Sequence, residues 1–215
     1  MLVVVVETAT PAVTAALARV GADRVDVLAE RITVDGRAHG ELLAPAVAGV
    51  LSDEGVKPGE LAAVVAGTGP GPFTGLRVGL VTAAAMAQTL GIPVYGVCSL
   101  DALGWCQPGR TLVATDARRR EIYWAVYEDG TRVDGPHVGR PVPHRADRAV
   151  GAGAMTYAEV LGMPVADEPR YPPPTALVSL AADRIRAHAP GEPLTPLYLR
   201  RPDATVPSGR KPTVP

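Results

Sequence analysis

The chain has 215 residues, 47% of them apolar, which suffices for one full domain or for two small lobes sharing a core. Its 21 basic and 22 acidic residues give a net charge of −1, and only 4% of the residues are aromatic. Phosphate contacts supply much of the affinity for nucleic acids and aromatic rings supply stacking, so this composition disfavours a protein that binds RNA by itself. Any contact with RNA is expected to be made through a partner.

Three consecutive strands are expected at the N-terminus. Residues 2–6 are an uninterrupted run of Leu and Val, typical of a strand buried on both faces. Residues 13–20 and 25–34 predict two further strands joined by a turn at 21–23. The run 2–6 is too short for a signal peptide or a membrane span, and no basic segment precedes it. The protein is therefore expected in the cytoplasm, with no membrane contact.

Two helices with broad apolar faces are expected next. Residues 38–54 carry apolar side chains at every third or fourth position, two per turn, which predicts a helix with a wide apolar stripe. After an apolar strand at 61–66, a loop rich in Gly and Pro at 67–75 leads into a helix of mostly small residues at about 76–90. Small side chains favour close packing of a helix on a sheet.

Shorter elements are expected after residue 90. Residues 94–98 and 112–115 predict strands, and Ser99 can cap a short helix that begins between them. Residues 121–127 alternate between two sets of side chains, which predicts a half-buried strand.

The pattern is weakest in the last third of the chain. Residues 128–148 are rich in Pro, Gly and charge and are expected to form loops with short strands. A brief strand is expected at 150–154, and Thr175 can cap a last helix that runs to His188. The tail 200–215 holds several prolines and few apolar residues, so it is expected to be extended or disordered.

Two loops that follow strands are candidates for binding phosphate. The turn at 7–10 is rich in hydroxyl groups, and the loop 67–75 precedes a helix, where backbone N–H groups attract anions. The second loop lacks the Lys of a Walker A motif and the spacing of a dinucleotide fingerprint. Both loops could equally be structural turns. The candidate phosphate-loop residues are Glu7, Thr8, Thr10, Gly69, Gly71, Thr74 and Gly75.

Residue chemistry alone predicts no active site. There is no GxSxG nucleophile motif, and Asp101 and Asp116, which stand near strand ends, are more typical of solvated carboxylates. Cys98 and Cys106 form no CxxC pair and are expected to be thiols in a reducing compartment. No two of the four histidines have the spacing of metal ligands on a helix; they are His39, His137, His144 and His188.

Several motifs together resemble the bacterial TsaB (YeaZ) family. The block Gly-Pro-Gly-Pro-Phe-Thr-Gly-Leu-Arg is highly specific to it. The resemblance covers about residues 1–127 and the C-terminal end, whereas 128–190 carry little of it. The motifs are Val-Glu-Thr-Ala-Thr at 6–10, the Gly- and Pro-rich block within 67–79, Gly-Val-Cys-Ser-Leu-Asp-Ala-Leu at 96–103, Thr-Asp-Ala-Arg-Arg at 115–119, Glu-Ile-Tyr-Trp-Ala at 121–125 and Pro-Leu-Tyr-Leu-Arg at 196–200.

The resemblance implies an α/β chain with the actin/hexokinase-like fold, which consists of two ribonuclease-H-like lobes with mixed β-sheets. Residues 1–100 are expected in the N-terminal lobe and 101–199 in a second, smaller lobe. The last helix, at about 175–188, is expected to pack back on the first lobe, and residues 200–215 form the tail.

The resemblance also implies a role in making threonylcarbamoyl-adenosine beside the anticodon of tRNA. In that family the catalytic subunit is the paralogue TsaD, and a TsaE-like ATPase joins a larger complex. This chain is then a non-catalytic scaffold that pairs with a TsaD-like subunit, reaches tRNA only through the complex, and forms a possible homodimer when alone. ATP and metal are expected on the partner subunits, and this chain requires no cofactor.

TsaD-type enzymes carry a His-x-x-x-His metal pair in the segment that matches residues 97–103. The corresponding residues here are Ser99 and Leu103, which supply no imidazole, so neither catalysis nor a metal site is expected in this chain. His39 and Glu41 match a His-Glu pair that is usual in the family at the start of the first helix. The expected partner interface consists of His39, Leu42, Leu43, Ala46, Val47, Val50, Val78 and Thr82.

An alternative function stays open from the sequence. The chain could be a small ATP-dependent phosphotransferase of the same fold that uses Thr8, Thr10 and the loop 67–75. Glu7 is a departure from the family pattern, which has Asp at this position, and the change weighs against an ATP site.

Overall fold

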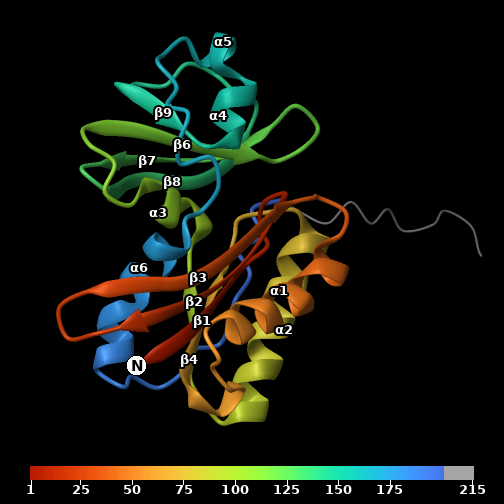
Figure 1. The fold of residues 1–215 in the computed structure, drawn as a ribbon. Helices are drawn as coiled ribbons and strands as arrows, with labels where there is room; N and C mark the ends of the chain where they lie inside the picture. The colour runs from red at the N-terminus through yellow and green to blue at the C-terminus, as the bar shows by residue number, and fades with distance from the viewer. Residues whose placement is uncertain (201–215) are drawn as a thin grey trace, which may run out of the picture.

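The computed structural model describes residues 1–200, so the predicted tail lies outside the described residues except for Arg200. The described residues form two lobes, each built around one β-sheet that mixes parallel and antiparallel strands (Figure 1). The first sheet has the order β3 (Val25–Val34), β2 (Ala12–Val20), β1 (Leu2–Glu7), β4 (Leu61–Gly67), β5 (Val94–Val97), and the second has the order β8 (Thr131–Gly139), β7 (Ile122–Glu128), β6 (Arg110–Asp116), β9 (Arg148–Val150).

Helices cover both faces of the first sheet. α1 (His39–Asp53) and α2 (Phe73–Leu90) lie on one face, and α6 (Pro174–Arg186) lies on the other (Figure 1). The central strand β1 therefore sends its side chains into two apolar cores, as its uninterrupted apolar run predicts. Val4 and Val6 pack in the core beneath α1 and α2, whereas Val3 and Val5 pack in the core beneath α6. A short helix, η1 (Pro58–Glu60), precedes β4.

The second sheet is also covered on both faces. α3 (Ser99–Gly104) packs on one face, and α4 (Ala152–Thr156) with α5 (Ala158–Leu161) packs on the other. The alternation of β7 is confirmed, but the prediction that this strand is half-buried is wrong, because both of its faces meet helices. Its two sets of buried side chains are Tyr123, Ala125 and Tyr127 toward α3, and Ile122 and Val126 toward α4 and α5.

The weakly patterned region contains more regular structure than the sequence predicts. Residues 128–148, expected to form loops with short strands, include the nine-residue strand β8. β8 lies at the edge of its sheet, so it keeps many exposed polar side chains and shows no clean alternation. The strand expected at 150–154 ends at Val150, because Gly151, with φ of 100°, turns the chain into α4.

Two predicted helix caps are also wrong. Cys98, not Ser99, is the N-cap residue of α3, because the Ser99 hydroxyl donates to the buried carboxyl group of Glu7. At α6 the N-cap residue is Pro173 in place of Thr175, and Pro174 takes the first helical position, where its fixed φ suits the helix.

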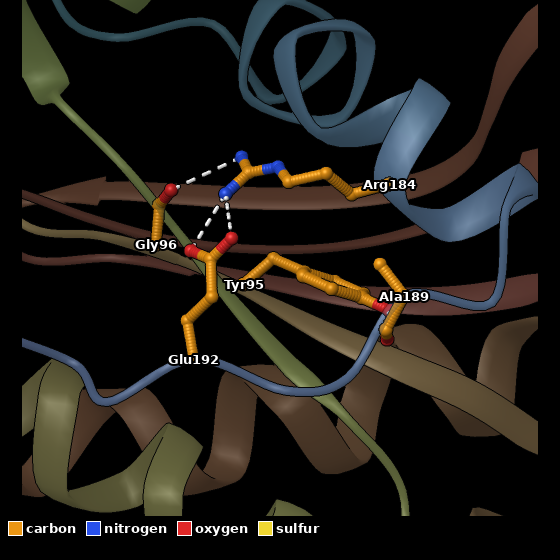
Figure 2. A network of polar contacts seen from close by, with 5 residues as sticks. All are labelled: Tyr95, Gly96, Arg184, Ala189 and Glu192. Carbon is orange, nitrogen blue, oxygen red and sulfur yellow. Dashed lines mark hydrogen bonds and ion pairs between the residues drawn. The ribbon is translucent and has the colours of Figure 1, made fainter.

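Polar contacts fasten α6 and residues 189–192 to the first lobe (Figure 2). Arg184 of α6 forms an ion pair with Glu192 at 2.7 Å and donates to the Gly96 carbonyl oxygen at 3.2 Å. The Tyr95 hydroxyl donates to the carbonyl oxygen of Ala189 at 2.5 Å. These contacts place α6 and residues 189–192 against the first sheet. The sequence predicts that only the last helix of residues 101–199 packs on the first lobe, whereas residues 189–192 lie there too.

The helices formed by residues 1–200 include none with the length and apolar character needed to cross a bilayer.

Candidate functional site

A cleft of about 480 Å³ lies between the two lobes. It opens where the β1–β2 turn and the loop 67–75 face the tip of the β6–β7 hairpin. The structure thus brings the two predicted phosphate loops together. The cleft lining includes Thr8, Thr10, Thr74 and Gly75 of these loops, His39 of α1, and Asp116 and Arg118 of the second lobe.

Glu7 lies beneath this cleft and is fully buried. Its Oε2 accepts a hydrogen bond from Ser99 Oγ at 2.6 Å, and its Oε1 accepts one from the Ala9 backbone N–H at 2.5 Å. Burial raises the pKa of this carboxyl group, and the hydrogen bonds from Ser99 and Ala9 oppose that rise. A Cβ atom on Gly67 would lie 1.7 Å from Oε2, so only Gly fits beside the carboxyl group. Glu7 links the end of β1 to the start of α3 inside the protein.

The hydroxyl groups of the β1–β2 turn are also used internally. Thr8 Oγ1 donates to the Gly75 carbonyl oxygen at 2.8 Å and accepts from the Gly79 backbone N–H at 3.0 Å. Thr10 Oγ1 accepts from the Ala12 backbone N–H at 3.2 Å. Both threonines are almost completely buried. A phosphate group would have to replace these contacts to use either hydroxyl.

Glycines allow the turn 7–10 to pack directly on the loop 67–75 and on α2. A Cβ atom on Gly79 would lie 2.4 Å from Thr8 Oγ1, and one on Gly71 would lie 2.1 Å from the Ala9 carbonyl oxygen. Gly69 donates its backbone N–H to Ser99 Oγ at 3.2 Å. Gly69 and Gly71 therefore support the packing of the loop and do not line the cleft. The close-packing interpretation of the loop 67–75 accounts for these contacts.

The two residues at the histidine positions of TsaD-type enzymes lie inside the protein. Ser99 is fully buried and bonded to Glu7, and Leu103 is fully buried in the core of the second lobe. Within residues 1–200 no group of three His, Cys, Asp or Glu side chains is placed to hold a metal ion. The residues at this place do not fit a metal.

The remaining titratable candidates are scattered over the second lobe. Asp101 accepts a hydrogen bond from the Tyr127 hydroxyl at 2.7 Å and forms an ion pair with Arg132 at 3.0 Å. The rings of His137 and His144 both contact Trp124, with centroids 4.5 and 4.2 Å from the centroid of the Trp124 ring. Burial lowers the pKa of His144. These residues do not converge with the interlobe cleft, so they form no shared catalytic constellation with it.

His39 fixes the beginning of α1. Its Nε2 lies 2.8 Å from the Thr10 carbonyl oxygen, and the side chain is buried. Glu41 is exposed in the first turn of α1, where a negative charge favours the helix dipole. The His-Glu pair therefore anchors and stabilises the start of a helix.

The eight predicted interface residues fall into two groups. Leu43, Val47 and Val50 are buried in the core beneath α1 and α2, so in this conformation they cover their own sheet. His39 is also buried, against the Thr10 carbonyl oxygen. The other four are half-buried at the edge of that core: Leu42, Ala46, Val78 and Thr82.

The outward-facing side of the two helices consists of small and apolar residues, most of which the sequence reasoning missed. Val81 is 66% exposed, the largest value among the large apolar side chains of the described chain. That α2 exposes some apolar side chain could have been predicted, because apolar residues of α2 continue beyond the buried stripe at 76, 80 and 83. We call this surface the α1–α2 face; it comprises Ala44, Pro45, Ala48, Val81, Ala84 and Ala85.

The α1–α2 face carries no charge. No charged residue lies between Glu41 and Asp53 on α1, or between Arg77 and Leu90 on α2. The two helices contact each other on the same side of the first sheet (Figure 1). The six residues of the α1–α2 face are all exposed. An uncharged, largely apolar surface two helices wide is typical of a protein–protein contact.

Comparison with known proteins decides the family. A model of the TsaD family, described as tRNA N6-adenosine threonylcarbamoyltransferase, matches residues 26–200. The structure of YeaZ from Pseudomonas aeruginosa superposes with a TM-score of 0.70, at 28% identity over 92% of this chain and 99% of that chain. The chain belongs to the TsaB (YeaZ) family. A second Pseudomonas aeruginosa structure, titled as similar to peptidase YEAZ, gives a TM-score of 0.76 at 29% identity over 93% and 99%.

Sequence relatives agree with this placement. A protein of Mycobacterium tuberculosis is 51% identical over 207 residues, which are 94% of this chain and 93% of that protein. A Mycobacterium leprae protein is 50% identical over 204 residues, but the chain spans only 56% of its length. The tRNA threonylcarbamoyladenosine biosynthesis protein TsaB of Bacillus subtilis is 36% identical over 105 residues, 47% of this chain and 46% of that protein. The predicted TsaB (YeaZ) family and its actin-like fold with two mixed sheets are confirmed.

Proposed function

We propose that this chain is a non-catalytic subunit in the biosynthesis of threonylcarbamoyl-adenosine in tRNA, and that it acts by pairing with a TsaD-like catalytic subunit through the α1–α2 face. The observation that carries the proposal is the absence of charge on that face together with the strong exposure of Val81. Membership of the TsaB family supplies the reaction. In this proposal ATP and metal bind to the partner subunits, including a TsaE-like ATPase.

The packing of the interlobe cleft supports a non-catalytic role. The hydroxyl groups that a phosphotransferase would need, on Thr8 and Thr10, are already bonded to backbone groups of this chain. The Glu7 carboxyl group is buried against Ser99 and is not directed into the cleft. The alternative function as an ATP-dependent phosphotransferase therefore has less support than a scaffold.

The composition of the α1–α2 face supports pairing with another chain. The centres of protein–protein interfaces are depleted of charged residues, and the α1–α2 face has no charged residue. The same face could bind a second copy of this chain when the catalytic subunit is absent, so a homodimer and the heterodimer would compete for it.

Co-purification with the TsaD-like protein of the same organism tests the interface. Val81→Glu places a charge at the exposed centre of α2, and we expect it to reduce complex formation at least tenfold, because burying an unpaired charge is costly. The variant should fold, since the Val81 side chain points mostly into solvent. Its thermal unfolding midpoint should match that of the unmodified protein.

Val133→Glu is the matched control. Val133 is 47% exposed on the edge strand β8 of the other lobe, so the same substitution there should leave complex formation unchanged. Equal loss of binding in both variants, or full binding by the folded Val81→Glu variant, would contradict the proposed interface.

A further inference from the structure

The tip of the β6–β7 hairpin consists of three consecutive arginines in an unusual backbone conformation. Arg118, Arg119 and Arg120 have φ angles of 59°, 56° and 61°, a left-handed region that residues with a Cβ adopt at a cost in free energy. Gly would adopt the same turn freely, yet none stands here. The turn is closed by the Glu121 backbone N–H, which donates to the Arg118 carbonyl oxygen at 3.0 Å. Strained backbone of this kind concentrates at functional sites.

Two further arginines extend this group across the second lobe. Arg140 follows β8, and Arg170 lies in the loop before α6, where its guanidinium stands 6.0 Å from the centre of the Tyr171 ring. All of these side chains are exposed. We call the group the arginine surface; it comprises Arg118, Arg119, Arg120, Arg140 and Arg170.

Four of the five arginines form no ion pair with a carboxylate of the described residues 1–200. They are Arg118, Arg120, Arg140 and Arg170. Seven arginines elsewhere do pair with carboxylates: Arg24, Arg31, Arg110, Arg132, Arg184, Arg186 and Arg200. The chain's overall charge of −1 therefore conceals a local excess of positive charge.

The arginine surface is hollowed in a way that suits an extended ligand. One hollow of about 510 Å³ is lined by Arg118, Arg119, Arg120 and Arg170, and a second of about 320 Å³ is lined by Arg119, Arg120 and Arg140. The two share Arg119, Arg120 and Tyr157, so they are continuous. The first also shares Asp116 and Arg118 with the interlobe cleft. A row of guanidinium groups along connected hollows fits several phosphates better than one small anion.

We infer that the arginine surface binds the phosphodiester backbone of RNA directly. Guanidinium groups donate two parallel hydrogen bonds to phosphate oxygens, and the rings of Tyr157 and Tyr171 beside them can stack on unpaired bases. That the RNA is tRNA rests on the proposed function. The inference changes the expectation that this chain reaches tRNA only through a partner, because the average charge hid a localised basic surface. The arginine surface shares no residue with the α1–α2 face.

The test measures binding of a tRNA transcript by fluorescence anisotropy at several salt concentrations. It uses this chain alone and in complex with its TsaD-like partner. The triple variant Arg118→Gln, Arg120→Gln and Arg170→Gln should weaken binding at least tenfold and should lower the slope of log affinity against log salt by roughly 3, about one for each arginine that no longer neutralises a phosphate. The control variant Arg19→Gln, Arg24→Gln and Arg145→Gln changes the same charge at exposed positions outside the arginine surface and should leave both quantities unchanged.

The outcomes separate this inference from the proposed function. Unchanged tRNA affinity and salt slope in the folded triple variant would overturn the inference, even if the Val81→Glu variant still loses its partner. If the triple variant keeps tRNA affinity but loses the partner, the surface binds an acidic protein and the inference is again wrong. If tRNA affinity falls as predicted while no TsaD-like partner binds the unmodified chain, the inference stands and the proposed function fails. The single variant Arg170→Gln, outside the strained turn, serves if the triple variant does not fold, with an expected reduction in the salt slope of about 1.

Discussion

At the scale of single residues, the buried carboxyl group of Glu7 has a structural role. It lies at the end of the first strand and is enclosed by Ser99, Ala9 and the space left by Gly67. The side chain reaches from β1 to Ser99 at the start of α3. Glu7 therefore acts as an internal cross-link, and the cleft above it receives no carboxylate from this strand.

The pH dependence of stability tests this account of Glu7. Burial raises its pKa above the ordinary value of 4.5, so the folded protein holds the proton more tightly than the unfolded chain. Its contribution to the free energy of unfolding is then fully present below pH 4.5 and is lost as the pH rises through the folded-state pKa. Glu7→Gln keeps the shape of the side chain without the charge, so we expect the variant to gain stability relative to the unmodified protein as the pH rises.

Urea denaturation of both proteins between about pH 4.5 and pH 8 measures this difference, since the slope of stability with pH reports the protons bound in each state. Parallel curves for the two proteins would show that Glu7 titrates normally in the fold.

At the scale of elements, the β1–β2 turn and α2 are held together by close backbone contact. Gly79→Ala would place a Cβ atom 2.4 Å from Thr8 Oγ1 and break the pair of hydrogen bonds that this hydroxyl makes. We expect a loss of about 1–3 kcal/mol in the free energy of unfolding, the usual cost of overpacking. Gly40→Ala on α1 is the matched control, because no atom lies within 4 Å of its added Cβ. Chemical denaturation measures both, and equal stability of the two variants would contradict the packing account.

The elements themselves were predictable where periodicity reports burial. β1 buries both of its faces, and its sequence is an uninterrupted apolar run. α1 and α2 each bury one stripe, and their apolar residues recur every three or four positions. β8 was not predictable, because an edge strand keeps polar side chains on much of its surface. Which apolar residues of α1 and α2 are exposed could not be predicted: a wide apolar stripe does not show which residues cover the sheet, as Leu43 and Val47 do, and which face outward, as Val81 does.

At the scale of the whole molecule, the two lobes carry different surfaces. The first lobe presents the uncharged α1–α2 face, and the second presents the arginine surface at the mouth of the interlobe cleft. Composition could not reveal either, since a net charge of −1 and a high apolar content are averages over the chain. The interlobe contacts could not be predicted for a related reason: the carboxyl group of Glu7 meets Ser99 from 92 positions away, a pairing that only the fold creates.

Reconstituted formation of threonylcarbamoyl-adenosine on a tRNA transcript tests the central claim most directly. With the other components of the pathway present, the account predicts no product from this chain without a TsaD-like subunit, product when both are present, and loss of product when Val81→Glu replaces the unmodified chain. Product formed by this chain in the absence of any TsaD-like subunit, or full activity with a folded Val81→Glu variant, would contradict it.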